Sequence, residues 1–415
     1  MIRAGSLAYA VFVSTITAVL CLLMIMVAAM NRNFFIHTDN FDRVRDNAHS
    51  GIMLGLALNS DNHEHWYELY EAGSDSVHLK KRRWGLYEVI SSRARIGQAS
   101  FQKTAVSGFW SHELSKTALW LRDRNRPLQL AGDALLKGEF YLPKKGVDRA
   151  YVEGTNYTRQ ELLYGTSENS DAKLPQLQKN WLSPWQDYLN GKFSEGDSLL
   201  DFGQLPQKLT LSFHRKTAVF QNKDEIRLGA YALKGNLILL SKSGIRVAAG
   251  CTLEQVVLIA PKIIVEEGFE GSLHAVAVDS LIIQKDVKLS YPSSLCMILE
   301  ELDRGPHLFM ADNSEVRGAV VSISSESRRA NDLAVEISPK ALVKGMLYCN
   351  GNLELNGTIE GGVWANTFML STPSGIYENH LLNGKIDRTE LEEGYLGLPL
   401  QPWNNKAEVA IWLPY

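Results

Sequence analysis

The first sixty residues show two successive patterns of apolar and polar positions. From Leu7 to Met30 no position carries a charge, and this run of 24 residues would form about 36 Å of helix, enough to cross a bilayer. Beyond it, apolar residues recur at helical spacing among charged ones. These later apolar positions are Phe34, Phe35, Phe41, Val44, Ala48, Ile52, Leu56 and Leu58. Residues 1–58 are therefore predicted to form one helix, transmembrane at first and then an amphipathic stalk.

Two questions about this helix stay open at the level of sequence. A cleavable secretory signal is the alternative to an anchor, but the apolar run is longer than a typical signal core and no small-x-small cleavage site follows it. Orientation is the second question. Arg3 precedes the run, whereas Arg32, Arg43 and Arg45 follow it, which favours a cytoplasmic C-terminal part. The stalk either packs on its own globular domain or assembles with other such helices.

The N-terminal residues carry a resemblance to a known family. Arg3-Ala4-Gly5-Ser6-Leu7-Ala8, followed by an unbroken apolar helix, resembles the N-termini of type IV minor pilins and pseudopilins. In that family a prepilin peptidase cuts after the glycine, so the resemblance implies processing between Gly5 and Ser6. The glutamate usual at the fifth mature position is replaced by Ala10, as in some minor members. The resemblance implies a single-pass inner-membrane protein with a periplasmic or extracellular ectodomain and pilin-like partner helices.

Residues 59–125 are rich in aromatic residues and are predicted to be an α+β connecting region. Asn62-His63-Glu64-His65 has metal-binding residue types, but the two histidines would diverge on a helix and HExxH is absent, so an exposed polar turn is expected. Lys80-Lys81-Arg82-Arg83 is a basic run. It would attract anionic lipid if it lay near the membrane, but a solvated turn is the simpler expectation.

From residue 126 to 390 a six-residue phrase recurs, consisting of an apolar residue, any residue, glycine, any residue and two apolar or aromatic residues. A glycine at a fixed place in each copy fits a sharp corner, where φ needs to be positive. The central glycines are Gly138, Gly235, Gly318, Gly345 and Gly361, with a looser copy at Gly271.

A spacing of 18 residues repeats independently between residues 236 and 290. Stacked coils keep such a period, because like side chains then lie above one another, whereas a sandwich has no reason to keep it. The four ladders are Ile245–Ile263–Leu281, Val247–Val265–Ile283, Cys251–Phe269–Val287 and Leu240–Leu258–Val276.

The predicted fold class is therefore mainly β with one long N-terminal helix, the β part being a right-handed β-helix-like solenoid. Insertions interrupt it at about residues 150–225 and 301–333, and residues 391–415 form a C-terminal extension. The short apolar-x-glycine coils resemble those of bactofilins, whose core is a right-handed β-helix without enzymatic activity. Bactofilins are shorter and more regular than this chain, so the resemblance does not imply self-polymerisation.

Net charge and cysteine content exclude only a few classes of partner and ligand. The net charge is -3, and no domain is basic enough to predict nucleic-acid binding. The cysteines lack the CxxC spacing of metal or redox sites, so Cys251, Cys296 and Cys349 are expected to be buried thiols, while Cys21 lies in the apolar run. No metal or cofactor is predicted.

The case for an enzyme rests on scattered charges alone. Carbohydrate-active β-helices need clustered carboxylates on one face. No GxSxG, P-loop or nucleotide-binding glycine motif is present, so no catalytic residue is predicted. The charged candidates, expected to be solvated, are Glu266, Glu267, Asp279, Lys285 and Asp286.

These patterns favour a non-enzymatic, membrane-anchored scaffold of a bacterial cell-envelope assembly, pilin-like or secretion-associated. It would contact membrane lipid through residues 7–30, bind partner proteins through the solenoid, and act in an oligomeric assembly. Two alternatives remain: a membrane-tethered carbohydrate-active β-helix enzyme, and a cytoplasmic bactofilin-like scaffold, which the arginine count favours.

Overall fold

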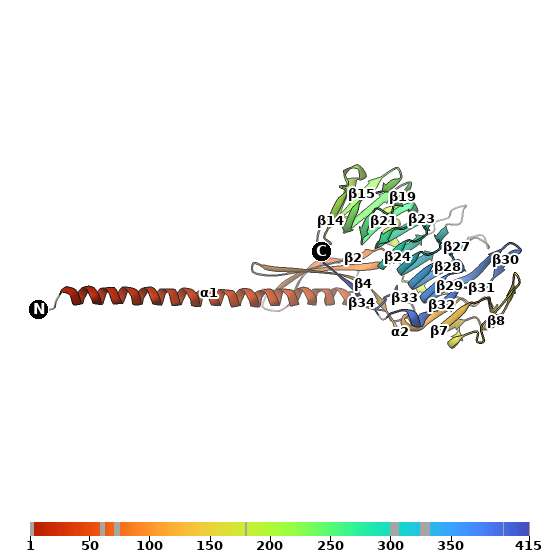
Figure 1. The fold of residues 1–415 in the computed structure, drawn as a ribbon, viewed down its shortest axis with the longest axis horizontal. Helices are drawn as coiled ribbons and strands as arrows, with labels where there is room; N and C mark the ends of the chain where they lie inside the picture. The colour runs from red at the N-terminus through yellow and green to blue at the C-terminus, as the bar shows by residue number, and fades with distance from the viewer. Residues whose placement is uncertain are drawn as a thin grey trace.

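The computed structural model describes residues 4–58, 63–69, 75–178, 181–298, 307–323, 333–392 and 394–414. Helix α1 (Ala4–Ala57) is 54 residues long and extends for about 80 Å. Its first half projects away from the rest of the molecule, and its second half lies along a β-sheet (Figure 1). The prediction of one continuous N-terminal helix is confirmed for the residues described.

The sheet beside α1 is antiparallel throughout. Its strand order is β1-β2-β3-β4-β34, so the last strand of the chain completes a sheet begun directly after the helix. Part of the predicted C-terminal extension therefore belongs to this sheet. The strands are β1 (His63–Glu68), β2 (Ser76–Trp84), β3 (Tyr87–Ile96), β4 (Ala99–Trp110) and β34 (Lys406–Leu413).

Close approach of α1 to the sheet depends on small residues. Val44, Ala48 and Ile52 are fully buried against strands β2 and β3. A Cβ atom at Gly51 would lie 2.2 Å from the Ser92 hydroxyl, and one at Gly55 would lie 2.6 Å from Ile90. These two glycines, poor helix formers by propensity, let the helix backbone reach the sheet.

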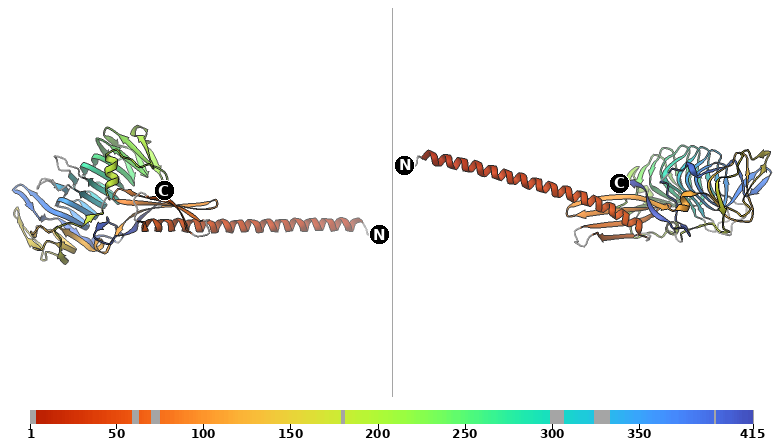
Figure 2. Two further views of the ribbon diagram at one scale, coloured as in Figure 1. Left: turned by 180° about the vertical axis from the view of Figure 1, so that it is seen from behind. Right: turned by 90° about the horizontal axis from the view of Figure 1, so that it is seen from below.

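Most of the remaining strands form a closed barrel, which is parallel except for the pairing of residues 369–372 with 375–378, and its stacked strands are visible in Figure 2. In its main row each strand lies beside the next in the order β13-β15-β18-β21-β23-β24-β26-β28-β29-β5-β7-β11. The strands of this row are β13 (Asp197–Asp201), β15 (Thr217–Asn222), β18 (Leu237–Ser241), β21 (Val256–Val265), β23 (Leu273–Ile283), β24 (Lys288–Ile298), β26 (Glu315–Ile323), β28 (Leu342–Leu355), β29 (Thr358–Thr372), β5 (Thr117–Leu121), β7 (Leu135–Leu142) and β11 (Tyr164–Asn169).

Shorter strands extend the other faces of the barrel or form small separate sheets. Paired with the barrel rows are β16 (Ile226–Leu228), β19 (Gly244–Val247), β22 (Glu270–Gly271), β25 (His307–Met310), β27 (Leu333–Ile337), β30 (Gly375–Glu378) and β32 (Lys385–Asp387). The small sheets use β6 (Leu128–Ala131), β8 (Val147–Arg149), β9 (Tyr151–Val152), β10 (Thr155–Asn156), β12 (Gln176–Leu177), β14 (Lys208–Leu211), β17 (Ala232–Gly235), β20 (Thr252–Glu254), β31 (His380–Leu382) and β33 (Leu400–Gln401).

The 18-residue spacing is confirmed on one side of the barrel and is wrong on another. Ile245 pairs with Ile263, and Ile263 with Leu281, as the spacing requires. However, Leu258 pairs with Leu239 and Ala275, so the expected Leu240–Leu258–Val276 ladder is displaced by one residue. The cause is the register shift between Ala260 and Lys262 in β21, because it changes the number of residues that separate paired positions on neighbouring coils.

The molecule is mainly β with one long apolar helix, as predicted. One core fills the barrel, and a second lies between the barrel's outer surface and the sheet face opposite α1. The short helix α3 (Ser183–Leu189), within the predicted polar insertion at 150–225, adds buried Trp185 and Tyr188 to this second core. The insertion at 301–333 lies partly outside the described residues. The finer description of the barrel, a right-handed β-helix, stays a prediction.

Candidate membrane and assembly surface

The first half of α1 exposes an unusual amount of apolar surface. Leu7, Met24 and Phe35 are exposed by 68%, 73% and 69%, and residues 7–30 carry no charge. Soluble proteins rarely expose contiguous apolar patches of this extent, which mark membrane or protein contacts. This helix is long and apolar enough to span a membrane.

The serine and threonine hydroxyl groups in this segment donate to carbonyl groups of the helix itself. Ser14 donates to the Val11 carbonyl at 2.9 Å, and Thr17 donates to the Val13 carbonyl at 2.9 Å. Thr15 donates to the Phe12 carbonyl at 2.8 Å. Because the helix satisfies its own backbone groups and these side-chain hydroxyl groups, the segment meets the main condition for lying in a hydrocarbon environment.

A buried carboxylate fixes the helix where it first meets the sheet. Asp75, just before β2, has a side chain only 1% exposed. Arg43 donates to both of its oxygens, at 2.9 and 3.1 Å, and Asn47 donates to one of them at 3.0 Å. Charge-assisted hydrogen bonds of this kind are the stronger ones in proteins, so they set both the rotation and the height of α1 on the sheet.

A buried lysine holds the other end of the helix. The Lys81 ammonium donates to the carbonyl oxygens of Gly55 and Leu58, at 3.2 and 2.7 Å, and lies 3.1 Å from a Glu88 carboxylate oxygen. The last carbonyls of a helix have no partner within the helix and carry partial negative charge, so a cation stabilises them. With the Asp75 contacts, this anchors both ends of the packed half of α1.

The basic run Lys80–Arg83 is therefore not the solvated turn expected from its composition. It lies within β2, and Lys81, Arg82 and Arg83 are 3%, 9% and 5% exposed. Their directions alternate along the strand, so Lys81 and Arg83 meet Glu88, while Arg82 contacts Asp197 at 3.5 Å. Burial behind these partners also removes three of the four residues from contact with lipid headgroups.

The sheet is joined to the barrel through the tight turn between β2 and β3. The Trp84 indole N–H donates to the Gln255 carbonyl at 2.7 Å, and the Leu86 N–H donates to the Ser294 hydroxyl at 3.1 Å. Gly85, with φ +59°, has no room for a Cβ atom, which would lie 2.4 Å from His274 Nδ1. Burial lowers the pKa of His274 to about 3, so this imidazole is neutral at pH 7.

Most of the predicted corner glycines lie in the parallel strands. Gly318 pairs with Gly345, Gly345 with Gly361, and Gly138 with Gly165, all at φ between +134° and +152°. Gly235 pairs with Leu211 and has φ +87°. Gly271 pairs with Leu289, and Leu289 pairs with Val316 on the next strand. The looser copy at Gly271 is therefore aligned two residues before Gly318 and lies outside this row. Their role as repeat corners stays a prediction.

The predicted processing residues lie on the exposed N-terminal helix. A Cβ atom at Gly5 would meet no other atom within 4 Å, and Ser6 is exposed. All four cysteines are described and none forms a disulfide. Cys251, Cys296 and Cys349 are buried, as expected, and Cys21 is exposed on the apolar half of the helix.

The histidine cluster is a strand and not the expected turn. His63 and His65 lie in β1, with ring centroids 6.1 Å apart, and His63 Nε2 is 2.5 Å from the Tyr67 hydroxyl. Asn62 lies outside the described residues. Within the described part of the chain, no group of three or more His, Cys, Asp or Glu side chains is placed to hold a metal ion.

The charged enzyme candidates are spread over the barrel surface. Glu267, Asp279, Lys285 and Asp286 are exposed, and Glu266 lies 3.7 Å from Arg246. Glu266 therefore belongs to a group of surface ion pairs in which Arg246 also contacts Glu225 at 2.9 Å.

Comparisons with known proteins add little to this geometry. No family model matches the chain, and no curated protein matches it. Among solved structures, the competence-associated pilin ComZ from Thermus thermophilus aligns over 84% of this chain and 87% of its own, at 10% identity and a TM-score of 0.17. A TM-score this low carries no argument for a shared fold.

Proposed function

We propose that this protein is a non-enzymatic, pilin-like component of a cell-envelope assembly. In this proposal the first half of α1 sits in the inner membrane and packs against similar helices, and the rest of the chain forms a periplasmic or extracellular domain that binds partner proteins. The observation that carries the proposal is a single helix with an exposed, uncharged first half and a second half anchored to a folded domain.

The apolar half supports both lipid and helix contacts. Its apolar residues occur all round the helix, as in a membrane span, and do not form the single stripe of a helix that packs on one neighbour. If the segment leaves the lipid, burying the same surface against like helices is the available way to shield it from water.

The anchored half supports a mechanical role. Because Asp75 and Lys81 hold the packed half at both ends, a force on the membrane segment would pass directly to the sheet. The Trp84–Gln255 and Leu86–Ser294 bonds then connect the sheet to the barrel. A scaffold that positions a binding domain needs such a rigid connection.

The barrel is proposed to be a right-handed β-solenoid serving as the binding surface. The support is the repeated parallel pairing at offsets of one coil, such as Ile245 with Ile263 and Gly345 with Gly361. Each coil contacts mainly its neighbours, so coils can vary their outward loops without losing the core. The proposed units are 1–58, 59–125 and 126–390, with 391–415 as an extension.

Cysteine crosslinking tests the assembly of α1. Cys21 is exposed on the apolar half, so oxidation of the full chain in membranes would join two copies whose helices pack in parallel at this face. The unchanged chain with Cys21 and three variants that carry Cys21→Ser with a single new cysteine at position 20, 22 or 23 together sample a whole turn. Disulfide-linked dimers at one or two adjacent positions are expected.

The Cys21→Ser chain without a new cysteine is the control for crosslinking through the buried thiols. Equal crosslinking at all four positions would indicate random collision, and none at any of them would reject helix assembly. Mass spectrometry of the mature chain is expected to begin at Ser6; an intact Met1 in the assembled protein would reject pilin-type processing.

Protease access tests the proposed side of the membrane. A small tag on the C-terminus should be cleaved from outside the inner membrane. Protection of the tag in intact cells, with cleavage after the membrane is opened, would place the domain in the cytoplasm, as the Arg32, Arg43 and Arg45 count favours.

A further inference from the structure

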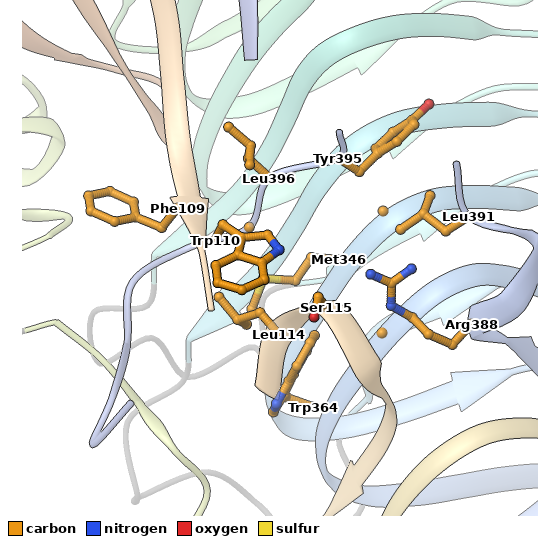
Figure 3. Close-up of a pocket in the computed structure, with 13 residues that line it drawn as sticks. Phe109, Trp110, Leu114, Ser115, Met346, Trp364, Arg388, Leu391, Tyr395 and Leu396 are labelled. Atoms are coloured by element: carbon orange, nitrogen blue, oxygen red, sulfur yellow. The ribbon is translucent and has the colours of Figure 1, made fainter. Parts of the chain in front are cut away.

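The pocket between β4, the short helix α2 (His112–Lys116) and the barrel is too small to hold a ligand. It encloses about 20 Å³, with Trp110 on one side and Arg388 on the other (Figure 3). This is space for about one water molecule. A binding site is therefore better sought from the chemistry of clustered side chains than from this cavity.

The edge strand β1 carries three such side chains on one face. His63, His65 and Tyr67 alternate with Glu64 and Trp66, so the first three lie on the same side of the strand. Two histidines that are two residues apart would diverge on a helix, but on a strand they lie side by side. The strand conformation thus removes the reason for which the sequence alone argued against a metal site here.

The three rings lie close enough for the two imidazoles to share one cation. The ring centroids of His63 and His65 are 6.1 Å apart, and Tyr67 lies 5.8 Å from the first and 5.2 Å from the second. A Zn–N bond is about 2.0–2.1 Å and a ring nitrogen lies about 1.2 Å from its centroid, so two imidazoles on one ion have centroids at most about 6.5 Å apart. The separation of His63 and His65 is within this limit.

Packing holds Tyr67 in place, and Tyr67 in turn orients His63. The Tyr67 ring packs against the core cluster that contains Ile52 and Leu79, and its hydroxyl oxygen is 2.5 Å from His63 Nε2. When Nε2 donates its proton to this oxygen, Nδ1 keeps the free lone pair that a metal ion needs. His65 is exposed, so its ring can turn toward the same ion without losing buried contacts.

The neighbouring charges leave this face open to a cation. Lys81 pairs with His63 across the strands, but its ammonium lies 3.1 Å from a Glu88 carboxylate oxygen, which compensates its charge. His78 pairs with Trp66, so it lies on the opposite face of the sheet, where its Nε2 is 3.4 Å from Glu64. His78 is therefore separate from the three-ring cluster.

We propose that His63 and His65 bind a late first-row divalent cation, Zn²⁺ or Cu²⁺, with Tyr67 orienting His63 and water completing the coordination. Neutral imidazole nitrogens suit these two ions, whereas Mg²⁺ and Ca²⁺ prefer carboxylate and carbonyl oxygens. Of the two, Cu²⁺ is expected to bind more tightly. The site is independent of membrane anchoring and of helix assembly.

Electron spin echo modulation of Cu²⁺ added to the untagged full chain in detergent micelles tests the site, because it distinguishes one copper-bound imidazole from two. The first equivalent of Cu²⁺ is expected to show two imidazoles. His63→Gln and His65→Gln should each lose this two-imidazole signal. Since His65 is exposed, unchanged thermal unfolding of the metal-free His65→Gln chain shows that its fold is intact.

Two further variants separate the site from other histidines of the chain. His78→Gln is the matched control, because it removes a histidine from the adjacent strand on the opposite face, and it should keep the two-imidazole signal. Tyr67→Phe should also keep both imidazoles but should weaken Zn²⁺ binding, measured by calorimetry, about tenfold, since the hydrogen bond that orients His63 is lost. Equal Zn²⁺ affinity in Tyr67→Phe would reject the orienting role of the tyrosine.

Three results would overturn the proposal. These are a single imidazole in the unchanged chain, a two-imidazole signal that persists in both His63→Gln and His65→Gln, and Mg²⁺ binding that is as tight as Zn²⁺ binding. Because crosslinking through position 21 is measured separately and needs no metal, failure here leaves the membrane-assembly proposal standing.

Discussion

The α1–sheet unit and the parallel barrel are stabilised in different ways. In the barrel, neighbouring strands repeat the same contacts, and glycines such as Gly345 let the backbones of successive strands approach closely. In the α1–sheet unit, single contacts that occur once hold the parts together, above all the three hydrogen bonds to Asp75. Losing one repeated contact therefore disturbs the barrel only locally, whereas losing one of the unique contacts changes how α1 is oriented on the sheet.

The largest effect is expected in the glycine row. A Cβ atom at Gly345, where φ is +136°, would lie 2.0 Å from the Gly318 carbonyl oxygen, so neither backbone can yield without breaking the coil pairing. Gly345→Val should lower the free energy of unfolding by about 3 kcal/mol or more. Urea unfolding of the full chain in detergent micelles, followed by tryptophan fluorescence, measures it. Gly375→Val, at φ +156° with no atom within 4 Å, is the control and should cost clearly less.

The helix clamp is expected to come next. Asp75→Ala leaves Arg43 and Asn47 without their acceptor and should lower the free energy of unfolding by about 2 kcal/mol. It should also speed hydrogen exchange in residues 43–57 while leaving the barrel unchanged, because the contact belongs to α1 alone. The exposed Asp46→Ala is the control. Equal exchange in both variants would show that packing of Val44 and Ile52 holds the helix without the clamp.

The joint between the two regions can be probed by a pair of glycines with the same backbone geometry. Gly85 has φ +59° and Gly97 has φ +57°, but only Gly85 faces packed atoms, His274 and Ser294. Both alanine variants carry the cost of a left-handed residue, about 1 kcal/mol, and Gly85→Ala should cost about 1 kcal/mol more. Equal losses in thermal stability would mean that the turn can shift away from the barrel.

Acid should weaken the same joint. The folded pKa of His274, about 3, lies below the ordinary value of 6.5, so the unfolded state binds the extra proton between these values. Stability is therefore lost as pH falls below about 6.5, by up to about 1.4 kcal/mol per pH unit from this group. Urea titrations at pH 7, 6 and 5 measure the slope. His274→Gln should flatten it, and the exposed His112→Gln should not; an unchanged slope in His274→Gln would assign the acid sensitivity elsewhere.

Periodicity predicted much of the fold, and its failures have a local cause. The ladder Ile245–Ile263–Leu281 is correct because its coils have equal length there. The ladder through Leu258 is wrong by one residue because β21 contains a register shift. No count of apolar positions reveals such a shift, since the nearest apolar residues before and after it, Ala260 and Ile263, are both buried.

The candidate surfaces also differ in how far the sequence alone could predict them. The exposed half of α1 was identifiable from sequence, because an uncharged run of that length has few other structures available to it. The burial of Arg82 and Arg83 was not, because their partners Asp197 and Trp181 come from distant parts of the chain. Only Glu88 is local, since it lies opposite Arg83 across the β2–β3 hairpin, and a strand pattern could have placed this one contact.

The sequence by itself determined the long helix, its uncharged first half and the β-rich repeat, because these depend on the spacing of residues close together in the chain. Only the tertiary structure decided that β34 completes the first sheet, that α1 is held by Asp75, and that Trp84 bonds to the barrel at Gln255. Each of these brings together residues far apart in sequence, and the energy of such a contact depends on geometry and burial that no local pattern contains.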